Sequence, residues 1–248
     1  PSIVVLDDCG NYLKSWGDDP MAYAHGISLG SDASVYLTYR DEHLAIKCSE
    51  DGNLLLSLGN KGVPSDAIYE GDPETTVRAA VKVIKAGGPF SRPCKLVSSP
   101  SGDLYVADGY SNARVHRFSD KGKLKFSWGQ PGNLEPGQFH VPHSVFVDEN
   151  GIVYVCDREN NRVQIFSGEG KFIDQWTDLW LPTDIYRDAN GNFFVTELTD
   201  RFSVFDRNGK LLSRVETVPG HGISGDSKGN IYMTTTYEGD LYKFVRTI

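Results

Sequence analysis

Short runs of alternating apolar and polar residues, separated by polar turns, recur along the whole chain. One recurring segment begins with a polar turn and continues with apolar residues at alternate positions, as in PSGDLYVAD (100–108), ENGIVYVCD (149–157) and ANGNFFVTE (189–197). A second begins with a glycine turn and ends near Trp-Gly, as in CGNYLKSWG (9–17) and KGKLKFSWG (121–129). Alternation with a period of two predicts β-strands that each bury one face.

One further short strand precedes each polar-turn segment and another follows it, so the repeating unit has four strands in roughly forty residues. This repeat is typical of β-propeller blades rather than of a sandwich or a βαβ sheet. Such units begin near residues 24, 92, 141, 181 and 219, whereas the first 17 residues supply only third- and fourth-strand motifs. We therefore expect a single all-β propeller domain over residues 1–248. The repeat predicts a six-fold ring with an incomplete sixth blade, and a five-bladed ring is the alternative.

The segment at about residues 61–90 interrupts this pattern. It contains DPETTVRAAVKVIKAGG, which predicts a helix with Asp72 as N-cap, Pro73 in the first turn and Gly87 near the C-cap. Four apolar residues fall at helical spacing on one face: Val77, Ala80, Val81 and Ile84. We expect a helical insertion between two blades, packed over one mouth of the central channel.

The first strand of a propeller blade is the innermost, and its side chains face the central channel. Alignment of the five first strands places one residue of each at the same level: His25, Cys94, His143, Thr183 and His221. Three neutral imidazoles around one ion, with a fourth position open, form the usual catalytic zinc site. The column therefore predicts a metal held by three histidines, either Zn²⁺ or another divalent transition metal that accepts imidazole.

The loops after the second strands open toward the same end of the channel and carry DGYSN (108–112) and DREN (157–160). Tyr110 in the first loop is a candidate catalytic base, because a cation beside a phenol favours its ionised form. Arg158 in the second loop is a candidate for binding a carboxylate, since its guanidinium offers a planar fork of donors. Arg40 lies one position after the second strand of its own blade and is another candidate for binding an anionic substrate.

The segments FHVPHSVFVDENGIVYVCDRENNRVQIF and YVADGYSNARVHRFSDKGKLKFSWG resemble NHL-repeat propellers, and more narrowly the peptidylamidoglycolate lyase family. The resemblance implies a zinc enzyme that cleaves a peptidyl-α-hydroxyglycine to a peptide amide and glyoxylate. On that basis His25, His143 and His221 match the zinc ligands. Tyr110 matches the catalytic base, and Arg158 matches the substrate-binding arginine. The expected partner is a small-molecule or peptide-like substrate that carries a carboxylate.

The chain also departs from that family. The third histidine lies in Pro-Gly-His-Gly rather than Met-Pro-His-Asp, so Gly222 stands where the family has an acidic residue implicated in an axial calcium site. This difference argues against calcium. The family's upstream blade, which contributes a further arginine, is absent or reduced to residues 1–17.

Two other functions stay open on the sequence. One is a metal-dependent propeller hydrolase acting on a lactone, ester or phosphotriester. Propeller hydrolases usually hold their metal with carboxylates and asparagine, so the histidine column disfavours that function. The other is a non-catalytic NHL module that binds a partner on one face, which gives no reason for a histidine-lined channel.

Composition narrows the partners. A formal net charge of −8 argues against a nucleic-acid backbone as the main partner. No run approaches the roughly 18 apolar residues of a membrane span, and no signal-peptide core is visible. We therefore expect a soluble monomer with no nucleic-acid or membrane partner, and the sequence leaves its compartment unknown. The four scattered cysteines, without a CxxC pair, predict free thiols.

Overall fold

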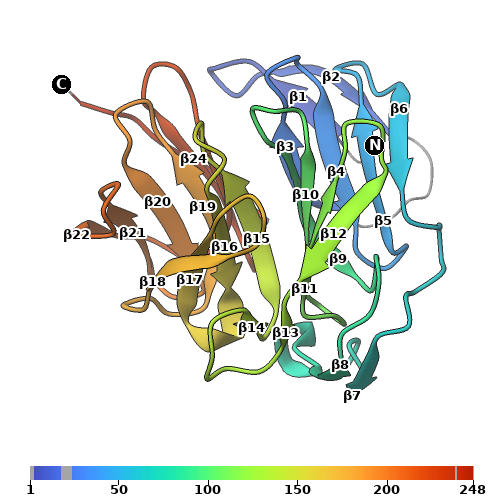
Figure 1. Cartoon of the computed structure of the whole chain (residues 1–248). Helices are drawn as coiled ribbons and strands as arrows, with labels where there is room; N and C mark the ends of the chain where they lie inside the picture. The colour runs from blue at the N-terminus through green and yellow to red at the C-terminus, as the bar shows by residue number, and fades with distance from the viewer. Residues whose placement is uncertain (1–2, 18–23, 238, 248) are drawn as a thin grey trace.

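Antiparallel sheets are arranged around a central axis in the computed structural model, which describes residues 3–17, 24–237 and 239–247 (Figure 1). Five of these sheets have three or four strands and follow one another along the chain as blades. The first strand of each blade packs against the first strand of the next, from β3 through β9, β15 and β19 to β23. The predicted all-β propeller is confirmed, and five blades have at least three strands, as in the alternative count.

The blades are built from the following strands. The first is β3 (Ala24–Leu29), β4 (Val35–Tyr39), β5 (Leu44–Cys48) and β6 (Leu54–Leu58). The second is β9 (Pro93–Ser98), β10 (Leu104–Asp108), β11 (Arg114–Phe118) and β12 (Leu124–Trp128). The third is β15 (Pro142–Val147), β16 (Val153–Asp157), β17 (Arg162–Phe166) and β18 (Phe172–Trp176). The fourth is β19 (Pro182–Arg187), β20 (Phe193–Glu197), β21 (Arg201–Phe205) and β22 (Leu211–Glu216). The fifth is β23 (Gly220–Gly225), β24 (Ile231–Thr235) and β25 (Leu241–Phe244).

A two-stranded hairpin of β1 (Ile3–Leu6) and β2 (Tyr12–Trp16) contacts both the first and the fifth blade. Trp16 packs against the apolar cluster of the first blade. Asp8, in the turn of the hairpin, forms an ion pair with Lys228 of the fifth blade at 2.9 Å. The hairpin is a separate two-stranded sheet in the described part of the chain, so the structure has five blades, as in the alternative, and not the six-fold ring that the repeat predicts.

Aspartates fix the tight turns between the first and second strands of the third, fourth and fifth blades. The Asp188 carboxylate accepts the backbone N–H groups two and four positions later, at 2.9 and 2.8 Å, and Asp148 and Asp226 do the same in their blades. Gly191 follows three positions after Asp188 with a φ of +87°, a conformation that glycine adopts without steric cost. The polar turns at Asp148, Asp188 and Asp226 are therefore Asx-type turns that reverse the chain between strands.

The hydrophobic core lies between neighbouring blades. One cluster joins the second blade to the third through Tyr105 and Phe166, and another joins the third blade to the fourth around Trp176. Trp176 is 5% exposed and stacks on Phe205, with ring centroids 5.0 Å apart. Successive side chains of a strand point to opposite faces, and each face packs against one neighbouring blade. The same alternation of apolar residues therefore recurs in every unit.

Replacement of Trp176 by alanine should therefore reduce the free energy of unfolding by about 3–5 kcal/mol, the usual cost of removing a large buried aromatic side chain. Equilibrium denaturation in urea measures this change. Leu212→Ala is the control, because Leu212 is 50% exposed, and it should change stability by less than about 0.5 kcal/mol. Equal effects of the two substitutions would contradict the interblade position of Trp176.

The helix predicted within residues 61–90 is wrong. Asp72 does accept the backbone N–H two residues later at 2.9 Å, but the chain then forms only the single 3-10 turn η1 (Val77–Ala79). On either side, β7 (Ile68–Glu70) and β8 (Lys82–Lys85) pair as an antiparallel hairpin. The segment is rich in β-branched residues: Thr75, Thr76, Val77, Val81, Val83 and Ile84. Such side chains favour extended backbone, so helical spacing of the apolar residues alone did not decide the structure.

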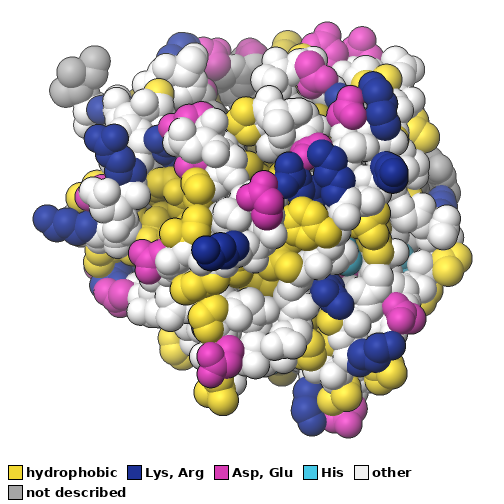
Figure 2. Space-filling view, in the orientation of Figure 1, with side chains coloured by type: hydrophobic (Ala, Val, Ile, Leu, Met, Phe, Trp, Pro, Cys, Tyr) yellow, Lys and Arg dark blue, Asp and Glu magenta, His cyan; other side chains and the backbone are white. Residues whose placement is uncertain are grey.

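The remaining elements are short. β13 (Gln130–Pro131) and β14 (Gln138–Phe139) form a parallel pair between the second and third blades, and η2 (Arg158–Asn160) follows β16. Within the described residues, η1 and η2 are three-residue turns, and no helix is long and apolar enough to cross a membrane. On the face shown in Figure 2, basic and acidic side chains are interspersed.

Candidate metal centre in the channel

A β-bulge displaces each of the five column residues from its strand ladder. In β3 the register shifts between Ala24 and Gly26, so His25 has no paired residue on β4. The equivalent shift leaves one residue unpaired in each of the other first strands: Cys94, His143, Thr183 and His221. Bulges re-aim side chains out of the normal alternation. The repeated bulge is thus the local reason why the aligned residues face the channel.

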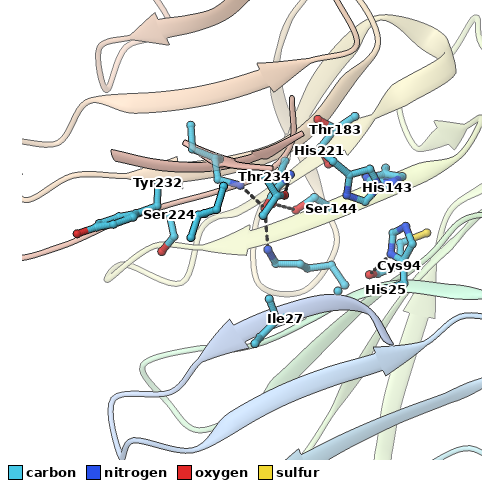
Figure 3. A pocket seen from close by; sticks show the side chains of 16 residues that line it. His25, Ile27, Cys94, His143, Ser144, Thr183, His221, Ser224, Tyr232 and Thr234 are labelled. Atoms are coloured by element: carbon cyan, nitrogen blue, oxygen red, sulfur yellow. Dashed lines mark hydrogen bonds and ion pairs between the residues drawn. The ribbon is translucent and has the colours of Figure 1, made fainter. Parts of the chain in front are cut away.

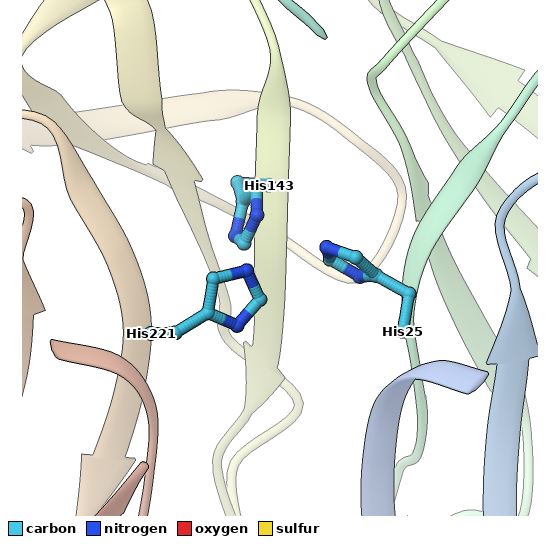
Figure 4. Close-up of side chains that lie close together, drawn as sticks. All are labelled: His25, His143 and His221. Carbon is cyan, nitrogen blue, oxygen red and sulfur yellow. The ribbon is translucent and has the colours of Figure 1, made fainter. Parts of the chain in front are cut away.

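The three histidines of the column come together from three different blades (Figure 4). Their ring centroids are 5.0 Å apart for His25 and His143, and 4.9 Å apart for each of the two pairs with His221. One ring nitrogen from each lies within 4.8 Å of the others. The chain's remaining histidines do not join this group: His43, His116 and His140.

Backbone carbonyls of the next blade orient two of the rings. His25 Nδ1 lies 2.9 Å from the Cys94 carbonyl oxygen, and His143 Nδ1 lies 2.7 Å from that of Thr183. Because a carbonyl oxygen only accepts, each Nδ1 carries the hydrogen and each Nε2 keeps its lone pair. This outer contact is the usual one for a metal-ligating histidine.

Burial keeps the three imidazoles neutral. It holds the pKa of His25 and of His143 well below the ordinary value, and it lowers the pKa of His221 to about 4. Burial also raises the pKa of the Cys94 thiol to about 12, so this member of the column is an uncharged thiol at neutral pH. All four cysteines are free, as predicted. The column thus presents three neutral nitrogen donors, which a divalent transition metal accepts.

Tyr110 lies directly against the histidines. Its hydroxyl oxygen is 3.0 Å from Nε2 of His25 and 3.0 Å from Nε2 of His143, and the side chain is 4% exposed. Gly109 allows this approach, because a Cβ at that position would collide with the backbone of Pro142 on the next blade. The DGY sequence therefore brings the phenol to the same point as two potential metal ligands.

The two predicted arginines flank the Tyr110 ring. The guanidinium carbons of Arg40 and Arg158 lie 5.3 and 5.2 Å from its centroid. Burial raises the pKa of Tyr110, whereas the positive charges of these two arginines oppose that increase. Arg158 also donates from Nη1 to the Tyr110 hydroxyl at 3.2 Å. Both cations are therefore placed to stabilise a phenolate.

Each nitrogen of Arg158 already donates to an atom of the protein. Its Nε donates to Glu159 at 3.0 Å, its Nη2 donates to the Arg78 carbonyl at 2.8 Å, and the residue is 2% exposed. The segment around η1 covers it, since Ala79 and Ala80 pack against Tyr110. The insertion therefore lies over this mouth of the channel, as predicted, although it is not helical. Arg158 contacts the expected base, and each of its three nitrogens already has one partner in the protein, which leaves one N–H group on Nη1 and one on Nη2 for another acceptor.

A cavity of about 240 Å³ opens on the histidines from within the channel. In Figure 3, His25 and His143 lie toward one end of this cavity, and Ser224 and Tyr232 lie toward the other. Its wall also includes Lys95 and a buried carboxylate at Asp184, which sequence reasoning missed. Both residues directly follow column positions, in β9 and β19, and that spacing was the available signal.

Comparisons with known proteins agree with the propeller fold and identify a group of more closely similar proteins. The NHL repeat family model matches residues 139–166. The chain is 32% identical over 274 residues to Peptidylglycine alpha-amidating monooxygenase of Rattus norvegicus, covering 99% of this chain and 26% of that protein. It is 31% identical over 179 residues to Peptidyl-alpha-hydroxyglycine alpha-amidating lyase 1 of Drosophila melanogaster, covering 67% of this chain and 29% of that protein.

Among solved structures, a streptogramin B lyase superposes with a TM-score of 0.63 at 13% identity, covering 98% of this chain and 75% of that one. At that identity the likeness supports the propeller fold alone. The chain spans less than a third of the length of the rat and fly proteins. The chain is therefore an NHL-repeat β-propeller and a homologue of the peptidyl-α-hydroxyglycine α-amidating lyases.

Proposed function

We propose that this propeller is a zinc-dependent lyase that cleaves an N-acyl-α-hydroxyglycine to an amide and glyoxylate. The observation that carries the proposal is the contact of the Tyr110 hydroxyl with two of three converging histidines. A potential base and a potential metal site thus meet at one point. Homology to proteins named for the amidating lyase reaction supports this choice of substrate.

The donor set fits zinc. His25, His143 and His221 would hold the ion through neutral nitrogens, and two of the rings have the carbonyl contacts typical of zinc-bound histidine. When bound, Zn²⁺ would supply a Lewis acid that makes a substrate hydroxyl more acidic. Another divalent transition metal would serve the same donors. No carboxylate belongs to the histidine group, which favours the lyase over a propeller hydrolase.

The residues of the site account for the proton transfers. Tyr110, as the phenolate, takes the proton of the substrate hydroxyl. The electron pair of that O–H bond forms the aldehyde C=O of glyoxylate, and the C–N bond breaks. The departing amide nitrogen takes a proton, which restores the charge balance, and Tyr110 is placed to return the one that it accepted. Arg158, at 3.2 Å, stabilises the phenolate that is present before Tyr110 accepts the proton and again after Tyr110 returns it.

Glyoxylate release tests this function directly. Protein stripped with a chelator and reloaded with one equivalent of zinc should convert N-benzoyl-α-hydroxyglycine to benzamide and glyoxylate in equal amounts, and the stripped protein should not. Zinc-loaded protein that released no glyoxylate but hydrolysed a lactone, an aryl ester or a phosphotriester would replace the lyase by the hydrolase. If the chain bound no metal at all, the non-catalytic NHL module would remain.

A further inference from the structure

Directly beyond the column of histidines, the first strands contribute a second layer of side chains to the channel cavity. The members of this layer are Gly26, Lys95, Ser144, Asp184 and Gly222. The two glycines have no side chain, so the layer consists of one cation, one hydroxyl and one carboxylate. These three groups are bonded to one another across three blades.

Asp184 is the fixed centre of the layer. Its Oδ1 accepts from the Ser144 hydroxyl at 2.5 Å and from its neighbouring backbone N–H at 2.9 Å. Its Oδ2 accepts from Lys95 at 2.7 Å and from the Ile223 backbone N–H at 3.0 Å. Each oxygen thus has two donors, which fills the acceptor capacity of an ionised carboxylate. The Asp184 side chain is 4% exposed, so it has no remaining role as an acceptor for a ligand.

Lys95, in contrast, is held in place but has donors to spare. Its ammonium reaches from β9 across the channel to β19, and its side chain is 14% exposed. It has three N–H groups, and within the described residues one of them has a hydrogen-bond partner, the Asp184 carboxylate. Lys95 is also the one lysine or arginine, among the described residues, that lines the cavity.

The other cations of the site already bind protein atoms outside the cavity. Every nitrogen of Arg158 donates to an atom of the protein, and two nitrogens of Arg40 are held by Asp41. Neither arginine lines the cavity, and Tyr110 also lies outside its lining, in contact with the Nε2 atoms of His25 and His143. An anion that reaches the histidines from the cavity therefore meets Lys95 and not these arginines. Since Asp184 neutralises Lys95 and the three imidazoles are neutral, a divalent metal would leave the cavity with a net positive charge, which favours an anionic ligand.

Building on the proposed function, we propose that Lys95 is the specificity-determining residue that binds the substrate carboxylate inside the channel cavity. The ligand class is a small N-acylamino acid with a free carboxylate. Asp184 and Ser144 are positioning residues, which fix the ammonium where the carboxylate is bound. The roles of the cations are thus divided: Arg158 acts on Tyr110, and Lys95 acts on the substrate.

The test is equilibrium binding of N-benzoylglycine to zinc-loaded protein by calorimetry, with N-benzoylglycinamide as the neutral comparison. N-benzoylglycine lacks the hydroxyl group and is not cleaved, so binding is measured whether or not the chain is a lyase. The wild-type protein should bind N-benzoylglycine more tightly than N-benzoylglycinamide. Lys95→Met should lower the affinity for N-benzoylglycine by about 10- to 100-fold, the usual range for a charge-assisted hydrogen bond. It should leave the affinity for N-benzoylglycinamide unchanged. Lys95→Arg should restore part of the preference.

Two further variants separate binding from folding. Lys95→Met leaves a buried carboxylate unpaired, so the double variant Lys95→Met/Asp184→Asn removes both charges and should show the same loss of preference. Lys125→Met is the matched control, because Lys125 pairs with Asp103 outside the cavity, and it should bind like wild type. Wild-type preference for the carboxylate in the double variant would overturn the proposal. So would wild-type protein that binds the acid and the amide equally, or that binds neither at millimolar concentration.

Discussion

His143→Ala should abolish stoichiometric zinc binding. His143 is the most buried of the three histidines, its Nδ1 is oriented by the Thr183 carbonyl, and its Nε2 contacts the Tyr110 hydroxyl. Loss of an outer contact to a ligand usually costs 10- to 100-fold in affinity, so removal of a ligand should cost more than about 100-fold. Metal analysis after gel filtration measures the zinc content. Added zinc should also raise the unfolding temperature of wild type and leave that of the variant unchanged, because only the native site binds the ion.

His140→Ala is the control for this result. His140 lies three positions before His143 and does not belong to the histidine group, so the variant should retain one zinc per chain. If His143→Ala kept its zinc while His140→Ala lost it, the metal site would lie outside the channel column. Zinc content unchanged in both variants would mean that the three imidazoles do not hold the ion.

Tyr110→Phe should lower kcat for glyoxylate release by about 10²- to 10⁴-fold, the usual contribution of a general base. The substitution keeps the aromatic ring between Arg40 and Arg158 and removes only the hydroxyl group that contacts His25. Zinc content should stay at one per chain, since the histidines are intact. The measurement is steady-state glyoxylate production from N-benzoyl-α-hydroxyglycine by zinc-loaded protein.

Tyr154→Phe is the matched control, because Tyr154 is also buried but packs between the third and fourth blades. Its kcat should equal that of wild type. A Tyr110→Phe variant with full activity would remove Tyr110 from the reaction and require another base near the histidines. Loss of zinc together with loss of activity would instead indicate that the hydroxyl helps to hold the metal site together.

Much of this architecture could be predicted from the sequence, because a propeller repeats its packing. Each blade meets the same kind of neighbour, so the apolar alternation and the polar turns recur, and alignment of the repeats is enough to predict the column. Tyr110 and the two arginines were found in the same way, from their place at the ends of second strands.

The rest depended on contacts that no repeat encodes. The segment after Asp72 has apolar residues at helical spacing, yet β8 within it pairs with β7 as a hairpin. The engagement of Arg158 by the Arg78 carbonyl joins residues 80 positions apart. Lys95 and Asp184, 89 positions apart, differ from their counterparts in the other blades, so alignment gave no reason to join them.

The carbonyl contacts of the column have a mechanical consequence. His25 donates to the second blade, His143 donates to the fourth, and Thr183 donates through its hydroxyl to the Gly220 carbonyl of the fifth at 3.0 Å. Each of these side chains is thus tied to the blade that follows its own, so the distance between donor nitrogens depends on the spacing of whole sheets. A bound ion would link three blades through their histidines. Any strain that moves the blades apart would therefore lower the affinity for the metal.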